Sequence, residues 1–233
     1  MLGIVIPAHN EEDLITTCLQ AAQAAAIHPG LKGEQVKIIV VLDSCTDATI
    51  SHVERCGIEF IILDARNVGV ARAIGAQALL ADGVRWLAFT DADTRVAPDW
   101  LVEQISLDVD CVCGTVSVDD WSPHGKHADL LKQHFEATYR DADGHCHIHG
   151  ANLGVSSNAY LCVGGFQHLA CSEDVAFVEA LRSCGATIAW SARPRVVTSA
   201  RKISRTAGGF ADALNGAVMA HMGQLSVGSN SSI

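Results

Sequence analysis

Two aspartates, Asp91 and Asp93, directly follow a short apolar run at residues 86–89 and are the residues best placed to do chemistry. The run predicts a strand, because Asp82 and Gly83 precede it and a polar turn follows it. Carboxylates two residues apart point to opposite faces of a continuing strand, but in a turn past the strand they can converge. Convergent carboxylates suit a hard divalent cation that takes its other ligands from water and phosphate oxygens. A solvated, Asp-rich turn is the alternative interpretation of this pair taken alone.

The elements that must position this pair are predicted from alternating apolar runs and polar turns. We expect strands at residues 2–6, 37–42, 59–63 and 86–89, with helices near 14–22, 48–56 and 70–80 between them. This β-α-β-α-β-α-β order indicates a doubly wound α/β fold with a mostly parallel sheet between two layers of helices. Later in the chain we expect strands at 110–118 and 187–190, and helices after Pro98, at 121–140 and after residue 174.

Polar residues follow each of the four early predicted strands. In a parallel sheet the carboxyl ends of the strands lie side by side at the edge where ligands bind. That edge offers carboxylates for a base and ribose, Arg72 for phosphate, and the aspartate pair for a phosphate-bound cation. The chain lacks both the Gly-x-Gly-x-x-Gly fingerprint after its first strand and the Gly-Lys-Ser/Thr phosphate loop. A nucleotide site is therefore predicted, but not that of a nicotinamide enzyme or a phosphate-loop hydrolase.

Composition narrows the class of protein further. With 233 residues and 49% hydrophobic content, the chain can bury one substantial core. A net charge of −10 argues against a nucleic-acid partner and against a broad anionic-membrane surface. No apolar run reaches the roughly 18–20 residues that cross a bilayer, and the start lacks the features of a signal peptide, so we expect a cytoplasmic protein. Peripheral membrane contact stays open, and the oligomeric state is not predicted.

The nine cysteines are odd in number and irregularly spaced. Cys111 and Cys113 occupy alternate positions of a β-like run, which is not the spacing of a zinc knuckle. We expect most of the cysteines to be buried, small apolar residues in a reducing compartment, not a disulfide or metal framework.

Several segments together resemble family 2 glycosyltransferases of the GT-A fold. The resemblance lies in residues 4–12 (IVIPAHNEE), 41–47 (VLDSCTD), 67–72 (NVGVAR) and 89–93 (FTDAD), in the order and at the spacing of that family. Residues 150–152 (GAN), 164–166 (GGF) and 172–174 (SED) extend it, so that it covers roughly residues 2–200. Any one motif is weak, but seven in order are specific.

The resemblance implies a role for each matching position. A nucleotide-sugar site is implied at Pro7, His9, Glu11, Asp43, Asp47, Arg72, Asp91 and Ala92. Asp93, together with Asp91, is implied to hold Mg²⁺ or Mn²⁺ on the diphosphate. Asp174 is implied to be the catalytic base. A donor and acceptor pocket is expected at His149, Gly150, Ala151, Asn152, Glu173 and Trp190.

The chemistry of such a transfer fits these residue types. The leaving diphosphate must be neutralised, which a cation and an arginine can do. The acceptor hydroxyl must lose a proton on the opposite face of the sugar, which is a task for one carboxylate. Asp174, at the start of a predicted helix, is expected to stay ionised. A single displacement would invert the anomeric configuration.

Two features do not follow the resemblance. Many GT-A enzymes use a histidine near the C-terminal end of the domain as a further metal ligand, but residues 197–202 contain no histidine. The basic residues in the segment 193–205 could neutralise the diphosphate instead. His145, His147 and His149 would share one face if they lie in a strand. No second cluster completes a zinc site, so we expect His149 to line the sugar pocket instead.

We therefore predict one GT-A domain at residues 1–222, with a nucleotide-binding half (1–95), an acceptor-binding half (96–222) and a flexible tail at 223–233. The predicted function is inverting transfer of a sugar from a UDP- or GDP-sugar to the hydroxyl of an unknown acceptor. A non-catalytic nucleotide-sugar-binding module and a nucleotidyltransferase are the alternatives. A nucleotidyltransferase would normally have a Gly-rich, basic loop after its first strand, where this chain is acidic.

Overall fold

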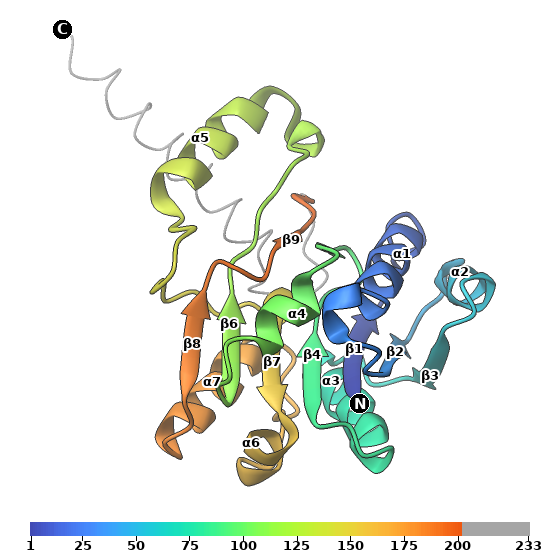
Figure 1. Cartoon of the computed structure of the whole chain (residues 1–233). Helices are drawn as coiled ribbons and strands as arrows, with labels where there is room; N and C mark the ends of the chain where they lie inside the picture. The colour runs from blue at the N-terminus through green and yellow to red at the C-terminus, as the bar shows by residue number, and fades with distance from the viewer. Residues whose placement is uncertain (202–233) are drawn as a thin grey trace, which may run out of the picture. The chain divides into compact units, whose positions relative to one another are not determined.

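Apolar, mostly β-branched runs form the centre of the fold, a seven-stranded sheet (Figure 1). The structure is a computed structural model that describes residues 1–201. The strand order is β3-β2-β1-β4-β7-β6-β8, and among these strands only β7 runs antiparallel to its neighbours. The predicted mostly parallel sheet is therefore confirmed. Its strands are β1 (Leu2–Ala8), β2 (Val36–Asp43), β3 (Glu59–Leu63), β4 (Trp86–Phe89), β6 (Cys111–Gly114), β7 (Leu153–Ser156) and β8 (Ile188–Ser191).

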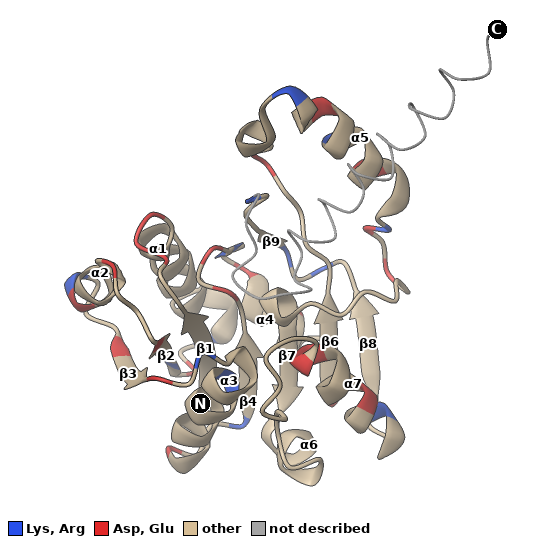
Figure 2. Ribbon diagram, turned by 180° about the vertical axis from the view of Figure 1, so that it is seen from behind, with Lys and Arg blue, Asp and Glu red and all other residues tan. Residues whose placement is uncertain are grey.

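Helices cover both faces of this sheet, which gives the predicted three layers (Figures 1 and 2). One face carries α1 (Ile15–Ala26) and α4 (Trp100–Ile105). The other carries α3 (Val68–Ala81), α6 (Ser157–Cys162) and α7 (Glu173–Ser183). α2 (Thr49–Arg55) connects β2 to β3. Short 3₁₀ turns occur at Pro29–Leu31 (η1) and Gly150–Asn152 (η3).

An aromatic cluster holds the second helical layer on the sheet. The Phe166 ring packs edge-on against Phe89 of β4, with centroids 4.9 Å apart, and stacks on Phe177 of α7 at 4.4 Å. Phe166 follows Gly165, whose φ is +77° and where a Cβ would come within 2.7 Å of the Tyr160 ring. The Gly-Gly-Phe turn therefore anchors the segment between α6 and α7 to the core.

Several boundaries differ from those predicted. β1 continues through Pro7 to Ala8, because a proline tolerates extended backbone even though it donates no hydrogen bond. The predicted strand at 110–118 is shorter, ending at Gly114. The predicted helix at 121–140 is a 3₁₀ segment, η2 (Ser122–His127), followed by α5 (Ala128–Thr138), because Gly125 has non-helical dihedral angles (φ 54°, ψ −124°).

Four elements have no counterpart in the prediction. β7 and α6 are two of them. The other two, β5 (Arg95–Val96) and β9 (Val196–Val197), form a small antiparallel sheet. Each is only two residues long and far from its partner along the chain, so neither produces a periodic signal in the sequence.

The chain forms two compact units. One contains Met1–Ser117 and Asp141–Thr198; the other contains Val118–Arg140 and, of the described residues, 199–201. In the second unit, Trp121, Leu131 and Ala200 form a small apolar cluster. The single domain proposed for residues 1–222, with its two halves, stays a prediction. The proposed tail at 223–233 lies outside the described residues.

The predictions on membrane-spanning segments and on the burial of the cysteines can be compared with the structure. Through residue 201, none of the helices combines the length and apolar character needed to cross a bilayer, and the cytoplasmic location stays a prediction. All nine cysteines are free, but only Cys18, Cys111 and Cys113 are buried. The expectation that most are buried is wrong, because Cys146, Cys162, Cys171 and Cys184 lie in loops or at helix ends and are exposed.

One ion pair makes the acid stability of the fold testable. Arg85, just before β4, donates two hydrogen bonds of 2.7 Å to Glu34, just before β2. These bonds lower the pKa of Glu34 from 4.5 to about 2. Because the folded pKa is the lower one, the stabilisation is complete above pH 4.5 and is lost as the pH falls through about 2.

We expect Glu34→Gln to lower the free energy of unfolding by about 1 kcal/mol near neutral pH, and to make no difference near pH 2. Urea titrations at both pH values measure this. Glu54→Gln, in the exposed part of α2, is the control and should change little at either pH. An equal loss at both pH values would contradict the assignment.

Candidate functional site

The loops after β1 and β2 are locked together by short hydrogen bonds. The Asn10 side chain accepts from the backbone N–H of Thr46 at 2.8 Å, and Glu12 accepts from that of Ala48 at 2.9 Å. His9 Nδ1 lies 2.7 Å from the carbonyl oxygen of Asp43. Because a carbonyl only accepts, Nδ1 carries the proton and Nε2 is left as an acceptor. Two of the predicted nucleotide-site residues, His9 and Asp43, are thus brought together.

Asp43 organises a third loop, the one after β3. Its carboxylate accepts from the backbone N–H groups of Ala65 and Arg66 at 2.8 Å and of Asn67 at 2.7 Å. Burial raises the pKa of Asp43, but these bonds and one from Ser44 outweigh it, so the net pKa is lowered and the group stays ionised. One lone pair of Oδ2 remains for a ligand.

Asp47 lies two residues before the first residue of α2, the helix that follows β2. Its Oδ1 accepts from the backbone N–H and the hydroxyl of Thr49, at 3.0 and 2.5 Å, and Oδ2 accepts from the N–H of Glu12 at 3.2 Å. The side chain therefore ties the start of α2 to the loop after β1. Pro7 is half-buried at the end of β1, and Glu11 is buried beside Thr49, whose hydroxyl accepts from the Glu11 N–H.

Arg72 of α3 is the buried centre of the site. Its guanidinium pairs with Asp91, just past β4, at 2.6 Å and with Glu173 at the start of α7. Arg72 and Glu173 are almost completely buried, whereas Asp91 is partly exposed. One cation thus joins the end of β4 to the first turn of α7, which is red in Figure 2. The sequence motifs did not predict this pairing.

The three predicted chemical aspartates share one electrostatic environment. Burial raises the pKa of Asp91; Arg72 opposes this shift, while the negative charges of Asp93 and Asp174 add to it. Burial and the charges of Asp93, Asp91 and Glu11 likewise raise the pKa of Cys18, whose thiol donates to the Asp91 carbonyl at 3.3 Å. The carboxylate oxygens gathered here are the hard ligands that a divalent cation prefers.

Asp174 is held by the backbone from both sides. Its Oδ2 accepts from the N–H of Gly150 at 2.8 Å, and its Oδ1 accepts from the N–H of Val175 at 2.8 Å. Gly150 begins η3, and a Cβ at this position would clash with the Arg72 guanidinium. A glycine is therefore needed where the chain passes between Arg72 and Asp174.

The three histidines before Gly150 form a column, although they are not in a strand. The His145 and His147 rings stack with centroids 5.5 Å apart, and those of His147 and His149 at 5.9 Å. Burial, and the neighbouring His147, lower the pKa of His149 to about 4, while the charge of Asp174 acts in the opposite direction. His149 is thus neutral at physiological pH and lies near Asp174.

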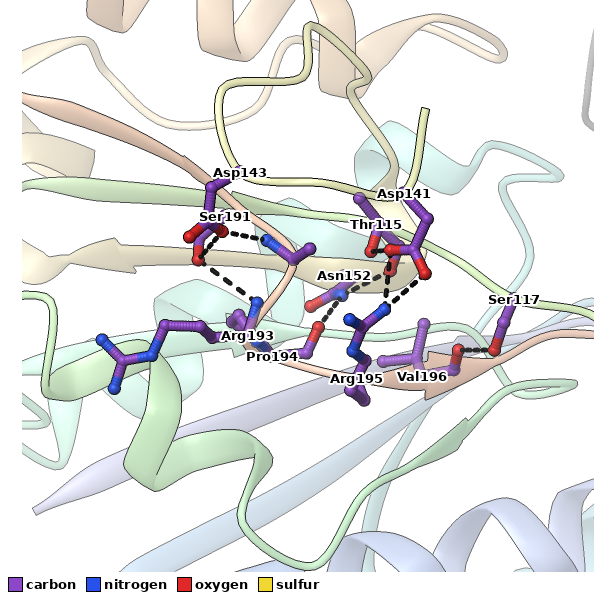
Figure 3. A network of polar contacts seen from close by, with 11 residues as sticks. Thr115, Ser117, Asp141, Asp143, Asn152, Ser191, Arg193, Pro194, Arg195 and Val196 are labelled. Atoms are coloured by element: carbon purple, nitrogen blue, oxygen red, sulfur yellow. Dashed lines mark hydrogen bonds and ion pairs between the residues drawn. The ribbon is translucent and has the colours of Figure 1, made fainter. Parts of the chain in front are cut away.

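The remaining predicted pocket residues are mostly buried or hydrogen-bonded within the fold. Ala92 and Ala151 are buried. Asn152 is fully buried, and its Nδ2 donates to the carbonyls of Thr115 and Pro194 (Figure 3). Its Oδ1 accepts from Trp100 at 2.8 Å. The Trp190 ring contacts His145 edge-on and lies beneath the Arg182 guanidinium.

Some arginines of the basic segment 193–205, which could neutralise a diphosphate, form ion pairs within the protein. Arg195 donates two bonds, of 2.6 and 2.5 Å, to Asp141, which also accepts from Thr115 (Figure 3). Arg193 pairs with Glu103 at 2.6 Å. Lys202 and Arg205 lie outside the described residues. Between residues 1 and 201, no cluster of three or more His, Cys, Asp or Glu side chains is arranged to hold a metal ion.

Removing the central cation gives a stability test of the site. We expect Arg72→Met to lower the free energy of unfolding by about 3 kcal/mol or more, since it leaves Glu173 and Asp91 without their buried partner. Adding Glu173→Gln should restore part of that loss. Arg55→Met, at an exposed arginine in α2, is the control and should cost less than about 0.5 kcal/mol. Denaturant titrations of these variants and of Glu173→Gln alone give the values; if the effects of Arg72→Met and Glu173→Gln simply added in the double variant, the coupling would be contradicted.

Solved structures with the same fold come from glycosyltransferases. A mannosyltransferase from Pyrobaculum calidifontis, in complex with GDP-Man and Mn²⁺, is 19% identical with a TM-score of 0.60; the match covers 88% of this chain and 58% of that one. TarS from S. aureus, in complex with UDP-GlcNAc, is 14% identical with a TM-score of 0.63, covering 90% and 61%. Both proteins thus extend well beyond the part that this chain matches.

Glucosyl-3-phosphoglycerate synthase from Mycobacterium tuberculosis, in complex with Mn²⁺, UDP and phosphoglyceric acid, is 15% identical with a TM-score of 0.59, covering 94% of this chain and 78% of that one. No curated protein sequence matches the chain. Residues 3–163, more than half of the chain, match the family described as glycosyl transferase family 2. The fold and this match agree with the resemblance predicted from the motifs, and the chain belongs to glycosyl transferase family 2.

Proposed function

We propose that this protein transfers a sugar from a UDP- or GDP-sugar to an acceptor hydroxyl, with inversion at the anomeric carbon. The observation that carries the proposal is the position of Arg72, whose two ion pairs hold Asp91, just past β4, next to Glu173 at the start of α7, one residue before Asp174. Such a transfer requires stabilisation of the leaving diphosphate and removal of a proton from the acceptor hydroxyl. The carboxylate pair after β4 would hold a cation for the first task, and the separate carboxylate at the start of α7 would accept the proton.

The nucleotide would bind at the carboxyl ends of β1, β2 and β4. In the strand order β3-β2-β1-β4, β2 and β3 lie on one side of β1 and β4 lies on the other, and such points, where the strand order reverses, form crevices that bind ligands. His9 would present its Nε2 acceptor, and Asp43 the free lone pair of Oδ2, to N–H or O–H donors of base and ribose. Pro7, Glu11, Asp47 and the backbone at Ala92 would complete the walls of this pocket.

The diphosphate would lie toward Asp93, and the residues present fit a bound Mg²⁺ or Mn²⁺. Asp93, with Asp91, offers the hard carboxylate oxygens that such a cation prefers as ligands. Bound there, the cation would supply charge neutralisation for the leaving diphosphate. Because these two carboxylates are too few to enclose a cation, the remaining ligands would come from phosphate oxygens and water. Metal binding and nucleotide binding are then linked.

Asp174 would take the proton from the acceptor hydroxyl. The N–H groups of Gly150 and Val175 fix the orientation of its carboxylate and leave a lone pair on each oxygen. Its position in the first turn of α7 favours the negative charge. The activated oxygen would then attack the anomeric carbon opposite the diphosphate in one displacement. Neutral His149, next to this carboxylate, would line the sugar pocket and donate or accept hydrogen bonds without competing for the proton.

The names of the structural relatives support the donor class. They are a mannosyltransferase with GDP-Man, TarS with UDP-GlcNAc, and a glucosyl-3-phosphoglycerate synthase with UDP, two of them with Mn²⁺. These names span two bases and several sugars, so the base, the sugar and the acceptor of this chain are matters for experiment.

A thermal-shift panel tests the nucleotide site. We expect UDP- or GDP-sugars to raise the melting temperature in the presence of Mn²⁺, and Mn²⁺ alone to raise it little, since the cation would need phosphate ligands. ATP and dTDP-sugars are the comparison ligands. No shift with any nucleotide diphosphate, with or without Mn²⁺, would argue against the whole proposal.

Two isosteric substitutions separate binding from chemistry. Asp174→Asn should retain Mn²⁺-dependent nucleotide binding and lower kcat by about 10²–10⁴-fold, because the proton acceptor is lost, together with one of the backbone N–H bonds from Gly150 and Val175. Asp93→Asn should instead weaken metal-dependent nucleotide binding by about tenfold or more. Donor turnover in the presence of candidate acceptors, calorimetry and NMR of the product anomer are the measurements.

Asp108→Asn, at an exposed aspartate before β6, is the control and should change neither property. If the Asp174→Asn variant turned over donor at the original rate, the base assignment would be wrong. If the unsubstituted protein bound nucleotide sugar but transferred none to any acceptor, a non-catalytic binding module would become the better description.

A further inference from the structure

The turn that carries Asp93 is closed by its own backbone. The N–H of Thr94 donates to the carbonyl of Asp91 at 3.0 Å, so residues 91–94 form a β-turn with Asp93 at its third position. The Cys18 thiol of α1 donates to the same carbonyl at 3.3 Å. These bonds fix the backbone of the turn, but they do not orient the Asp93 side chain.

A buried hydroxyl lies next to the Asp93 carboxylate. Thr94 is fully buried, and its Oγ1 lies 3.3 Å from Oδ1 of Asp93 and 2.9 Å from Oγ1 of Thr198. A hydroxyl has one proton to donate, and an ionised carboxylate can only accept. Thr94 therefore donates to Asp93 and accepts from Thr198. The two hydroxyls form a relay that runs from Thr198 through Thr94 to Asp93.

Thr198 is placed by the small sheet that the sequence did not predict. Thr94 directly precedes β5 and Thr198 directly follows β9, and these two strands pair with each other. On its other side, the N–H of Thr198 donates to the carbonyl of Ser117 at 2.8 Å. The Ser117 hydroxyl in turn donates to the Val196 carbonyl at 2.8 Å (Figure 3). Two hydroxyls that are 104 residues apart in the chain are thus held in contact.

The two aspartates of the pair have separate supports. Arg72 pairs with Asp91, whereas the hydroxyl relay contacts Asp93. Burial of a threonine near the turn does not by itself produce such a contact. Thr90, which directly follows β4, is also fully buried, but its hydroxyl has no hydrogen-bond partner among residues 1–201. The relay is therefore a specific arrangement around Asp93.

We propose that Thr94 and Thr198 are positioning residues for the cation site. This inference rests on the proposed function, in which Asp93 holds Mg²⁺ or Mn²⁺ on the diphosphate. The hydrogen bond to Oδ1 restricts rotation of the carboxylate before the cation arrives, so less of the binding free energy is spent on ordering it. Both hydroxyls act through Asp93 and are not themselves assigned as metal ligands.

Calorimetry of UDP and GDP binding to the full chain, with Mn²⁺ and with EDTA, tests the relay. We expect Thr198→Val to weaken Mn²⁺-dependent binding by about 10-fold or more, because the metal ligand loses the group that orients it. Binding in EDTA should not change. Thr198→Ser retains a hydroxyl and should restore the Mn²⁺-dependent affinity. Thr94→Val should cause a similar loss, and adding Thr198→Val to it should cause no further loss, because both hydroxyls act through one relay.

Thr90→Val is the matched control, because it removes a buried hydroxyl that has no partner between residues 1 and 201, and it should change neither affinity. Thr198 is only half-buried, so its substitution should leave the protein folded, which urea titration verifies.

Two results would overturn the relay alone and leave the nucleotide site in place. One is an unchanged Mn²⁺-dependent affinity in Thr198→Val. The other is an equal loss with Mn²⁺ and with EDTA, which would indicate a general distortion of the pocket. If the unsubstituted protein bound neither nucleotide with Mn²⁺, the proposed function would fail, and the proposed role of the relay would fail with it.

Discussion

The structure depends on one buried guanidinium. Arg72 lies on α3 inside the fold, where a lone cation would be strongly unfavourable, and its charge is balanced by Asp91 on one side and Glu173 on the other. Each partner belongs to a different part of the chain: the loop after β4 and the first turn of α7. Because each carboxylate would lose a buried ion pair by moving away from Arg72, one side chain holds the loop of the proposed metal ligands next to the helix start that carries the proposed base.

The loops around this centre are positioned by backbone amides more than by side-chain pairs. Asp43 accepts from three consecutive N–H groups, Asp47 ties α2 to the preceding loop, and Asp174 accepts from Gly150 and Val175. A carboxylate with such donors is oriented before any ligand arrives, so less of the binding free energy is spent on ordering the site. Several acidic residues of the family motifs thus build the site, whether or not they also contact a ligand.

The sequence predicts the first half of the fold well because that half is locally encoded. Strands 59–63 and 86–89 were predicted with the observed bounds, since continuous apolar runs between turn residues leave few alternatives. It does not predict β5 and β9, which exist only because residues about a hundred positions apart meet. It likewise places Arg72, Asp91 and Glu173 in the site but does not predict that Arg72 pairs with both carboxylates, because an ion pair between distant motifs leaves no spacing signal.

β7 runs opposite to the strands on either side of it. The other strands deliver their carbonyl ends to the ligand edge, whereas β7 arrives there with its amino end, preceded by η3. An incoming backbone offers N–H groups, and Gly150 gives one of these to Asp174. The reversal thus adds donors to an edge otherwise rich in oxygen atoms. It also brings the chain back to this edge of the sheet between β6 and β8, so that residues of the second half of the protein lie beside the loops of the first half.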